Sequence, residues 1–74
     1  MINRKKMERL QQDILDLLSK FKRPVSTQEI ADNLRGKPWH SVHTRCLMLQ
    51  VDGKITGFRV GRMNLWQIRE GHEK

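Results

Sequence analysis

The chain has 74 residues, with 15 lysines and arginines, eight aspartates and glutamates, and one cysteine. This length suits one small domain, and the lone Cys46 excludes an internal disulfide, so packing must hold the fold. No apolar stretch approaches the roughly 18 residues of a membrane-spanning helix, and no signal peptide follows the charged N-terminus. We therefore expect one domain over 1–74, in the reducing cytoplasm and not in a membrane.

Charge is the strongest signal of the composition, with a formal net charge of +7 and a pI near 10.4. Residues 1–23 hold seven basic and three acidic groups, residues 24–36 one and two, and residues 37–74 seven and three. Small basic domains attract polyanions because each neutralised phosphate releases condensed counterions. The composition favours a nucleic-acid partner over the two alternatives, a merely soluble basic protein and a protein that binds anionic membranes.

Two helices are predicted in the first half of the chain. Apolar residues recur every three or four positions over about 4–21, which predicts an amphipathic helix that Pro24 prevents from continuing. The stretch "STQEIADNL" predicts a second helix over about 27–34, since Ser26 and Glu29 have the spacing of a capping box.

A third helix is predicted over about 38–51, with Pro38 as its first residue, where the missing N–H costs nothing. Val42, Cys46 and Leu49 are spaced four and three apart, so they share the side of this helix that faces the interior. The opposite side carries mostly polar groups.

The last third of the chain changes to period two, which predicts a β-hairpin over about 54–69. Gly61 and Arg62 suit a two-residue type II′ turn, so that Gly57 lies opposite Trp66 and Ile55 lies opposite Ile68. We expect Trp66 in the core, because a glycine partner leaves room for its ring.

The order of helix, helix, helix and hairpin resembles the winged helix-turn-helix DNA-binding superfamily. "STQEIADNL" followed by Val42, Cys46, Leu49, Gly53 and Ile55 looks like the spacing of apolar residues and glycine in that family. The resemblance covers about residues 10–68. It implies an α+β fold with a recognition helix over 38–51 and a wing over 54–69, and the role of a small transcriptional regulator.

The resemblance also implies which residues contact double-stranded DNA. Residues just before and after Val42 enter the major groove, and a wing arginine reaches the minor groove or the backbone. Trp39 has two interpretations, one closing the core and one stacking on the DNA backbone. The candidate DNA contacts are Lys37, Trp39, His40, Ser41, His43, Thr44, Arg45, Arg59 and Arg62.

A metal site or a catalytic site is the alternative interpretation of "HSVHTRC". His40, His43 and Cys46 could approach one side of a helix, but a structural zinc site needs a second ligand pair that the sequence lacks. A Cys–His catalytic pair needs an exposed thiolate, whereas Cys46 belongs to the apolar set. We expect no enzyme, no metal and no cofactor.

Partners other than DNA stay open. Phe58, Val60, Met63 and Leu65 share the outer side of the predicted wing and are more apolar than exposed positions need to be. A homodimer or a protein partner could cover them, and the same fold also serves as a protein-interaction adaptor. RNA is a weaker alternative, because no platform of stacking aromatic residues is evident.

Overall fold

Helix α1 (Arg9–Phe21) opens the computed structural model, which describes residues 8–69. Ile14 and Leu18 are buried on one side of it, as the periodicity predicts. Glu8 is extended (φ −64°, ψ 154°), and its backbone N–H donates to Gln11 Oε1 over 3.4 Å. The helix therefore begins at Arg9 and not at the predicted position 4; positions 4–7 lie outside the described residues.

Helix α2 (Thr27–Asn33) starts at the predicted place, because Ser26 Oγ accepts the backbone N–H of Glu29 over 3.0 Å. The reciprocal half of the capping box is replaced by an ion pair. The Glu29 carboxylate faces Arg23, with 2.7 Å between Oε2 and Nη2.

Helix α3 (Trp39–Val51) begins one residue later than predicted. Pro38 is the residue before the helix and not its first residue, with a ψ of 138°. Its carbonyl accepts the N–H groups of Ser41 (3.1 Å) and Val42 (3.2 Å), so the proline still starts the hydrogen-bond ladder.

Strands β2 (Ile55–Val60) and β3 (Met63–Ile68) form the predicted hairpin in the predicted register. Gly61 has a φ of 60°, whereas Arg62 is not among the residues with positive φ, as a type II′ turn requires. Trp66 covers Gly57 so closely that a Cβ built on the glycine would lie 2.4 Å from Trp66 Cζ3. The predicted core position of Trp66 is confirmed.

A third strand was not predicted. Strand β1 (Val25–Ser26) pairs antiparallel with β3, and the order in the sheet is β1-β3-β2. The sheet therefore has three strands and not two. A two-residue strand is too short to show any period, so the sequence pattern could not reveal it.

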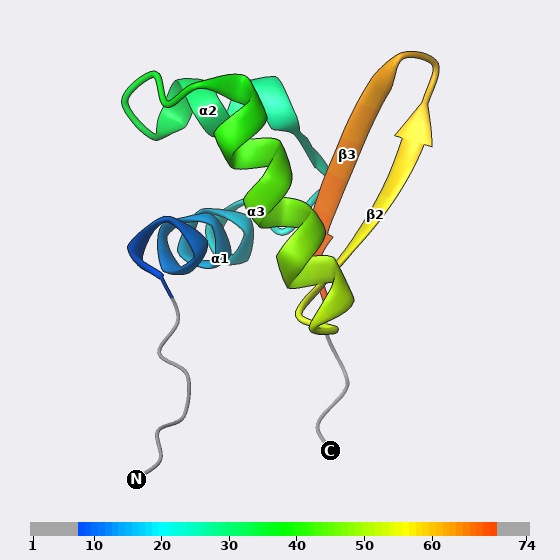
Figure 1. The fold of residues 1–74 in the computed structure, drawn as a ribbon. Helices are drawn as coiled ribbons and strands as arrows, with labels where there is room; N and C mark the ends of the chain where they lie inside the picture. The colour runs from blue at the N-terminus through cyan, green and yellow to red at the C-terminus, as the bar shows by residue number, and fades with distance from the viewer. Residues whose placement is uncertain (1–7, 70–74) are drawn as a thin grey trace, which may run out of the picture.

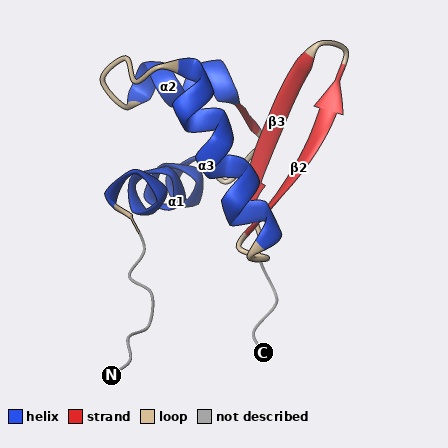
Figure 2. Cartoon of the chain, in the orientation of Figure 1, coloured by secondary structure: helices blue, strands red, loops and turns tan. Residues whose placement is uncertain are grey.

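The three helices pack beside one face of this sheet, and the hairpin extends beyond them (Figure 1). Its turn lies at the same end of the molecule as α2 and the start of α3 (Figure 2). The core between these elements is made of ten buried residues: Ile14, Leu18, Val25, Ile30, Ala31, Val42, Cys46, Leu49, Ile55 and Trp66.

Candidate nucleic-acid interface

The two sides of α3 differ as the sequence pattern predicts. Val42, Cys46 and Leu49 are fully buried, whereas His40 and Thr44 are exposed on the opposite side. Ser41, between these two sides, is half-buried. The start of α3 therefore presents short polar side chains outside the core, where hydroxyl and imidazole groups can donate to or accept from a ligand.

Three aromatic rings join the start of α3 to the wing. The Trp39 and His43 rings stack with centroids 4.6 Å apart and an angle of 11°, and His43 meets Trp66 edge-on at 5.6 Å. His43, predicted on the outer side of α3, is half-buried because its ring lies between the two tryptophans. Trp39 remains 43% exposed and lies outside the core cluster, which removes the interpretation that it closes the core.

A buried hydroxyl connects this row of rings to α2. Thr27, 2% exposed, accepts the indole N–H of Trp66 over 2.8 Å, and its Oγ1 lies 3.5 Å from His43 Nδ1. The sequence pattern assigned no role to Thr27. A hydroxyl at the first position of α2 was the only available signal, and its partners come from α3 and β3.

Arg45 was predicted at the flank of the recognition surface, and the structure gives it a partner. Its Nε and Nη2 donate to the Glu8 carboxylate, the second over 3.2 Å, and its Nη1 lies 3.8 Å from Met48 Sδ. Part of its charge is therefore neutralised by the residue that precedes α1, which the local sequence around Arg45 could not indicate.

The wing carries two exposed arginines. Arg59 lies in β2 opposite Asn64, and Arg62 is the second residue of the turn. Within residues 8–69, neither makes an ion pair. Alternation along the strands puts Arg59 and Asn64 on the face of the sheet that holds Trp66. Arg59 can therefore meet an anionic ligand that also contacts α3.

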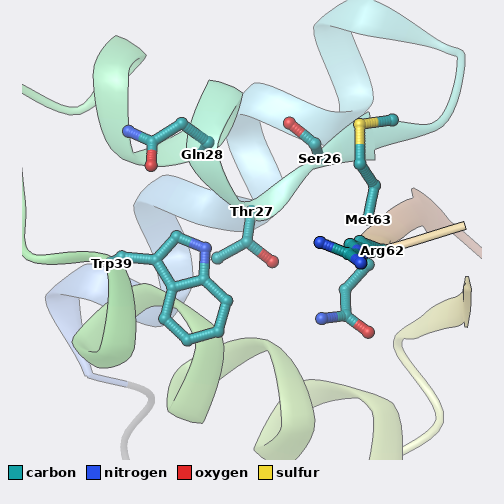
Figure 3. Close-up of a pocket in the computed structure, with 7 residues that line it drawn as sticks. Ser26, Thr27, Gln28, Trp39, Arg62 and Met63 are labelled. Carbon is teal, nitrogen blue, oxygen red and sulfur yellow. The ribbon is translucent and has the colours of Figure 1, made fainter.

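A hollow of about 190 Å³ lies between the start of α2, the start of α3 and the start of β3. Figure 3 shows Trp39 on one side of it, Met63 and Arg62 on the other, and Thr27 between them. The full lining is Ser26, Thr27, Gln28, Trp39, Arg62, Met63 and Asn64. The structure thus brings Trp39 and Arg62 together, two residues that the sequence pattern placed on separate elements.

None of the residues that line this hollow is acidic, and Glu29, which follows Gln28 in α2, is paired with Arg23. No aspartate or glutamate occurs from Asn33 to Val51 or from Gly53 to Arg69. Lys37 and Arg35 are exposed in the loop between α2 and α3. This loop lies at the same end of the molecule as the wing turn (Figure 1). The surface made by the α2–α3 loop, the start of α3 and the wing tip is therefore positive, which favours a polyanionic ligand.

The candidate metal-binding and catalytic residues differ in burial. Burial raises the pKa of the Cys46 thiol to about 12, so the thiol stays protonated at neutral pH. His40 is exposed, while Cys46 is fully buried. Within residues 8–69, no three histidine, cysteine or acidic side chains gather as metal ligands would.

The outer face of the wing is apolar, as predicted. Phe58, Val60 and Met63 are each about half-exposed, and Leu65 is half-buried. Leu47 and Met48 on α3 are also exposed. In the part of the chain that the structure describes, no helix is both long and apolar enough to cross a membrane.

Solved structures include proteins similar to this chain. No family model and no curated protein matches the chain. A solved structure from work on the DNA recognition and protein interaction domains of HOP2, and on its homologous DNA pairing properties, matches with a TM-score of 0.74 and 25% identity. The match covers 81% of this chain and 98% of that one.

This likeness and the element order agree. Three helices with a three-stranded antiparallel sheet, in the order seen here, make this chain a winged-helix protein of α+β class with the fold of a DNA-binding domain. The resemblance stated from the sequence is thereby confirmed at the level of the fold, and the likeness supports DNA binding by a winged helix.

Proposed function

We propose that this chain binds double-stranded DNA, with the first turns of α3 in the major groove and the wing tip on the minor groove or its backbone. The observation that carries this proposal is the charge of the α2–α3 loop, the start of α3 and the wing turn, which hold basic but no acidic residues and lie at one end of the molecule (Figure 1). DNA phosphates attract such a surface whatever the base sequence of the DNA. Polar side chains at the centre of the surface can add contacts to the bases.

The residues divide into two roles. His40, Ser41, His43 and Thr44 contact base edges, because they are the short polar groups at the start of α3. Phosphates are contacted by Lys37, Arg59 and Arg62, which have no ion-pair partner among residues 8–69. Arg45 contributes less, since Glu8 already holds it.

Trp39 and the hollow fit the strand of DNA that runs between the two grooves. A duplex held by both α3 and the wing must pass one sugar–phosphate backbone across the space between them. There the exposed ring of Trp39 can pack on a deoxyribose while Arg62 meets the neighbouring phosphate. We propose transcriptional regulation by occupancy of such sites, in the cytoplasm.

A second candidate function has its own support. The outer wing face formed by Phe58, Val60, Met63 and Leu65 fits a protein partner or a second copy of the chain, and Met63 at its edge also borders the hollow. The HOP2 study concerns protein interaction as well as DNA recognition. Sedimentation over a range of protein concentrations distinguishes a homodimer from a monomer. If the chain is a homodimer, the Phe58→Ser variant should sediment with the mass of a monomer, while the DNA-contacting side stays intact.

The deciding experiment is selection of bound duplexes from a random pool at several salt concentrations. If the protein recognises a DNA sequence, one site should be enriched among the bound duplexes. Four to six phosphate contacts predict a slope of log affinity against log salt concentration of roughly −4 to −5. The double variant His43→Ala and Thr44→Ala should lose preference for the selected site but keep the slope. A salt-insensitive complex, or no binding at all, contradicts the proposal.

A further inference from the structure

The Thr27 hydroxyl has one hydrogen-bond direction fixed by its partner. An indole N–H can only donate, so Trp66 Nε1 donates to Thr27 Oγ1 over 2.8 Å. Thr27 is 2% exposed although it borders the hollow, so its own proton needs an acceptor, since a buried unsatisfied hydroxyl costs about 1–3 kcal/mol.

His43 offers that acceptor. Among the described residues, the second partner of Thr27 Oγ1 is His43 Nδ1, at 3.5 Å. When the hydroxyl donates to Nδ1, this nitrogen carries no proton, and the neutral imidazole must hold its proton on Nε2. The two nitrogens of the ring then have different and fixed roles.

The neighbouring rings keep His43 in this orientation. Trp39 stacks on one face of the imidazole at 4.6 Å, and Trp66 meets it edge-on at 5.6 Å. Turning the ring over would place a carbon where Nδ1 now faces Thr27, and the hydrogen bond would be lost. Because Nδ1 faces the interior, Nε2 lies on the side of the ring directed away from Thr27.

We propose that Thr27 is a positioning residue that holds His43 with its proton on Nε2, so that His43 offers DNA a hydrogen-bond donor and never an acceptor. This inference rests on the proposed function for its consequence. In the major groove a donor suits guanine N7 or O6, adenine N7 and thymine O4, and it rejects the amino group of cytosine. Thr27 therefore restricts which base can lie opposite His43, although it does not touch DNA itself.

The first test is made on the full chain without DNA, so it is independent of the proposed function. Long-range ¹H–¹⁵N NMR at mildly alkaline pH reports which nitrogen of each histidine carries the proton. Wild-type His43 should show a protonated Nε2 and a bare Nδ1. Thr27→Val should shift His43 toward the mixture seen at the exposed His40, and Thr27→Ser should restore the wild-type spectrum.

A protonated Nδ1 in the wild-type protein overturns the proposal, as does a Thr27→Val spectrum identical to the wild type. Should Thr27→Val not fold, the wild-type and Thr27→Ser spectra decide alone.

The second test is duplex selection with the same variants. Discrimination at one base position should fall by roughly two- to tenfold in Thr27→Val, as expected for one hydrogen bond, and return in Thr27→Ser. The salt slope should stay constant, because Thr27 meets no phosphate. Equal loss at every position would make Thr27 merely structural and overturn the proposal. Absence of any DNA binding would instead reject the proposed function and leave the NMR result standing.

Discussion

Residues 8–32 hold four lysines and arginines and five acidic groups, whereas residues 33–69 hold seven and one. In the first region Arg9 pairs with Asp13 and Arg23 with Glu29. In the second region Arg59 and Arg62 make no ion pair with any described residue. The first region thus has nearly balanced charges, with Glu8 paired to Arg45 of the second region. The second region leaves most of its positive charge available to a ligand.

The same division appears in the two tryptophans. Trp66 is 3% exposed and packs on Gly57, while Trp39 is half-exposed beside the hollow. One ring contributes to the stability of the fold, and the other is available for binding. Variants that remove or reverse these differences test whether the division is functional.

The largest predicted effect is a difference in stability between alanine variants of the two tryptophans. Trp66→Ala should destabilise the protein by about 3–5 kcal/mol, because it leaves a cavity and removes the hydrogen bond that the Thr27 hydroxyl accepts from the indole. Trp39→Ala should cost less than about 1 kcal/mol but weaken DNA binding. Urea unfolding followed by circular dichroism measures both. Similar losses of stability in the two variants would show that Trp39 also belongs to the core.

Burial of the Cys46 thiol on the inner side of α3 should make the stability of the protein depend on pH. The pKa of Cys46 rises from 9.0 to about 12 through burial, so only the unfolded chain loses the thiol proton between these values. Stability should therefore be fully present below about pH 9 and fall by about 1.4 kcal/mol per unit as pH rises toward 12.

Cys46→Ala is the control for this prediction, since lysines and arginines titrate equally in both proteins. The stability difference between wild type and variant should narrow above pH 9 and stay constant below it. A constant difference across the whole range would show that the thiol reaches solvent.

The wing arginines should affect binding and not stability. Arg59→Ala with Arg62→Ala should weaken DNA binding by roughly tenfold, about 1.4 kcal/mol, and lower the salt slope by about two. The matched control is Lys20→Ala with Lys22→Ala, two exposed lysines at the end of α1 and just after it. Fluorescence anisotropy with a short duplex measures both. Equal losses would mean that the whole surface attracts DNA without a defined face.

The smallest effect concerns the ion pair that joins the two regions. Glu8→Gln should reduce stability by less than about 1 kcal/mol, because the Glu8–Arg45 pair is partly exposed. The same change should raise DNA affinity about two- to threefold, since Arg45 is then free to meet phosphate. Arg45→Gln should lower stability similarly without raising affinity. If Glu8→Gln weakens binding, Arg45 acts through its orientation by Glu8.

Short-range spacing in the chain was enough to predict much of this protein. The three- and four-residue spacing of Val42, Cys46 and Leu49 predicted the buried side of α3, and alternation around Gly61 predicted the full register of the hairpin. These features depend on residues a few positions apart, and the periods of helix and strand translate them directly into geometry.

The tertiary structure alone decided the remaining features. Strand β1, the position of His43 between Trp39 and Trp66, the Thr27 hydrogen bonds and the Glu8–Arg45 pair all join residues distant in the chain. No local period encodes such contacts, because they arise only when α1, α2, α3 and the wing pack against one another. Which of the polar groups on α3 stay free for a ligand is therefore settled by packing, not by spacing.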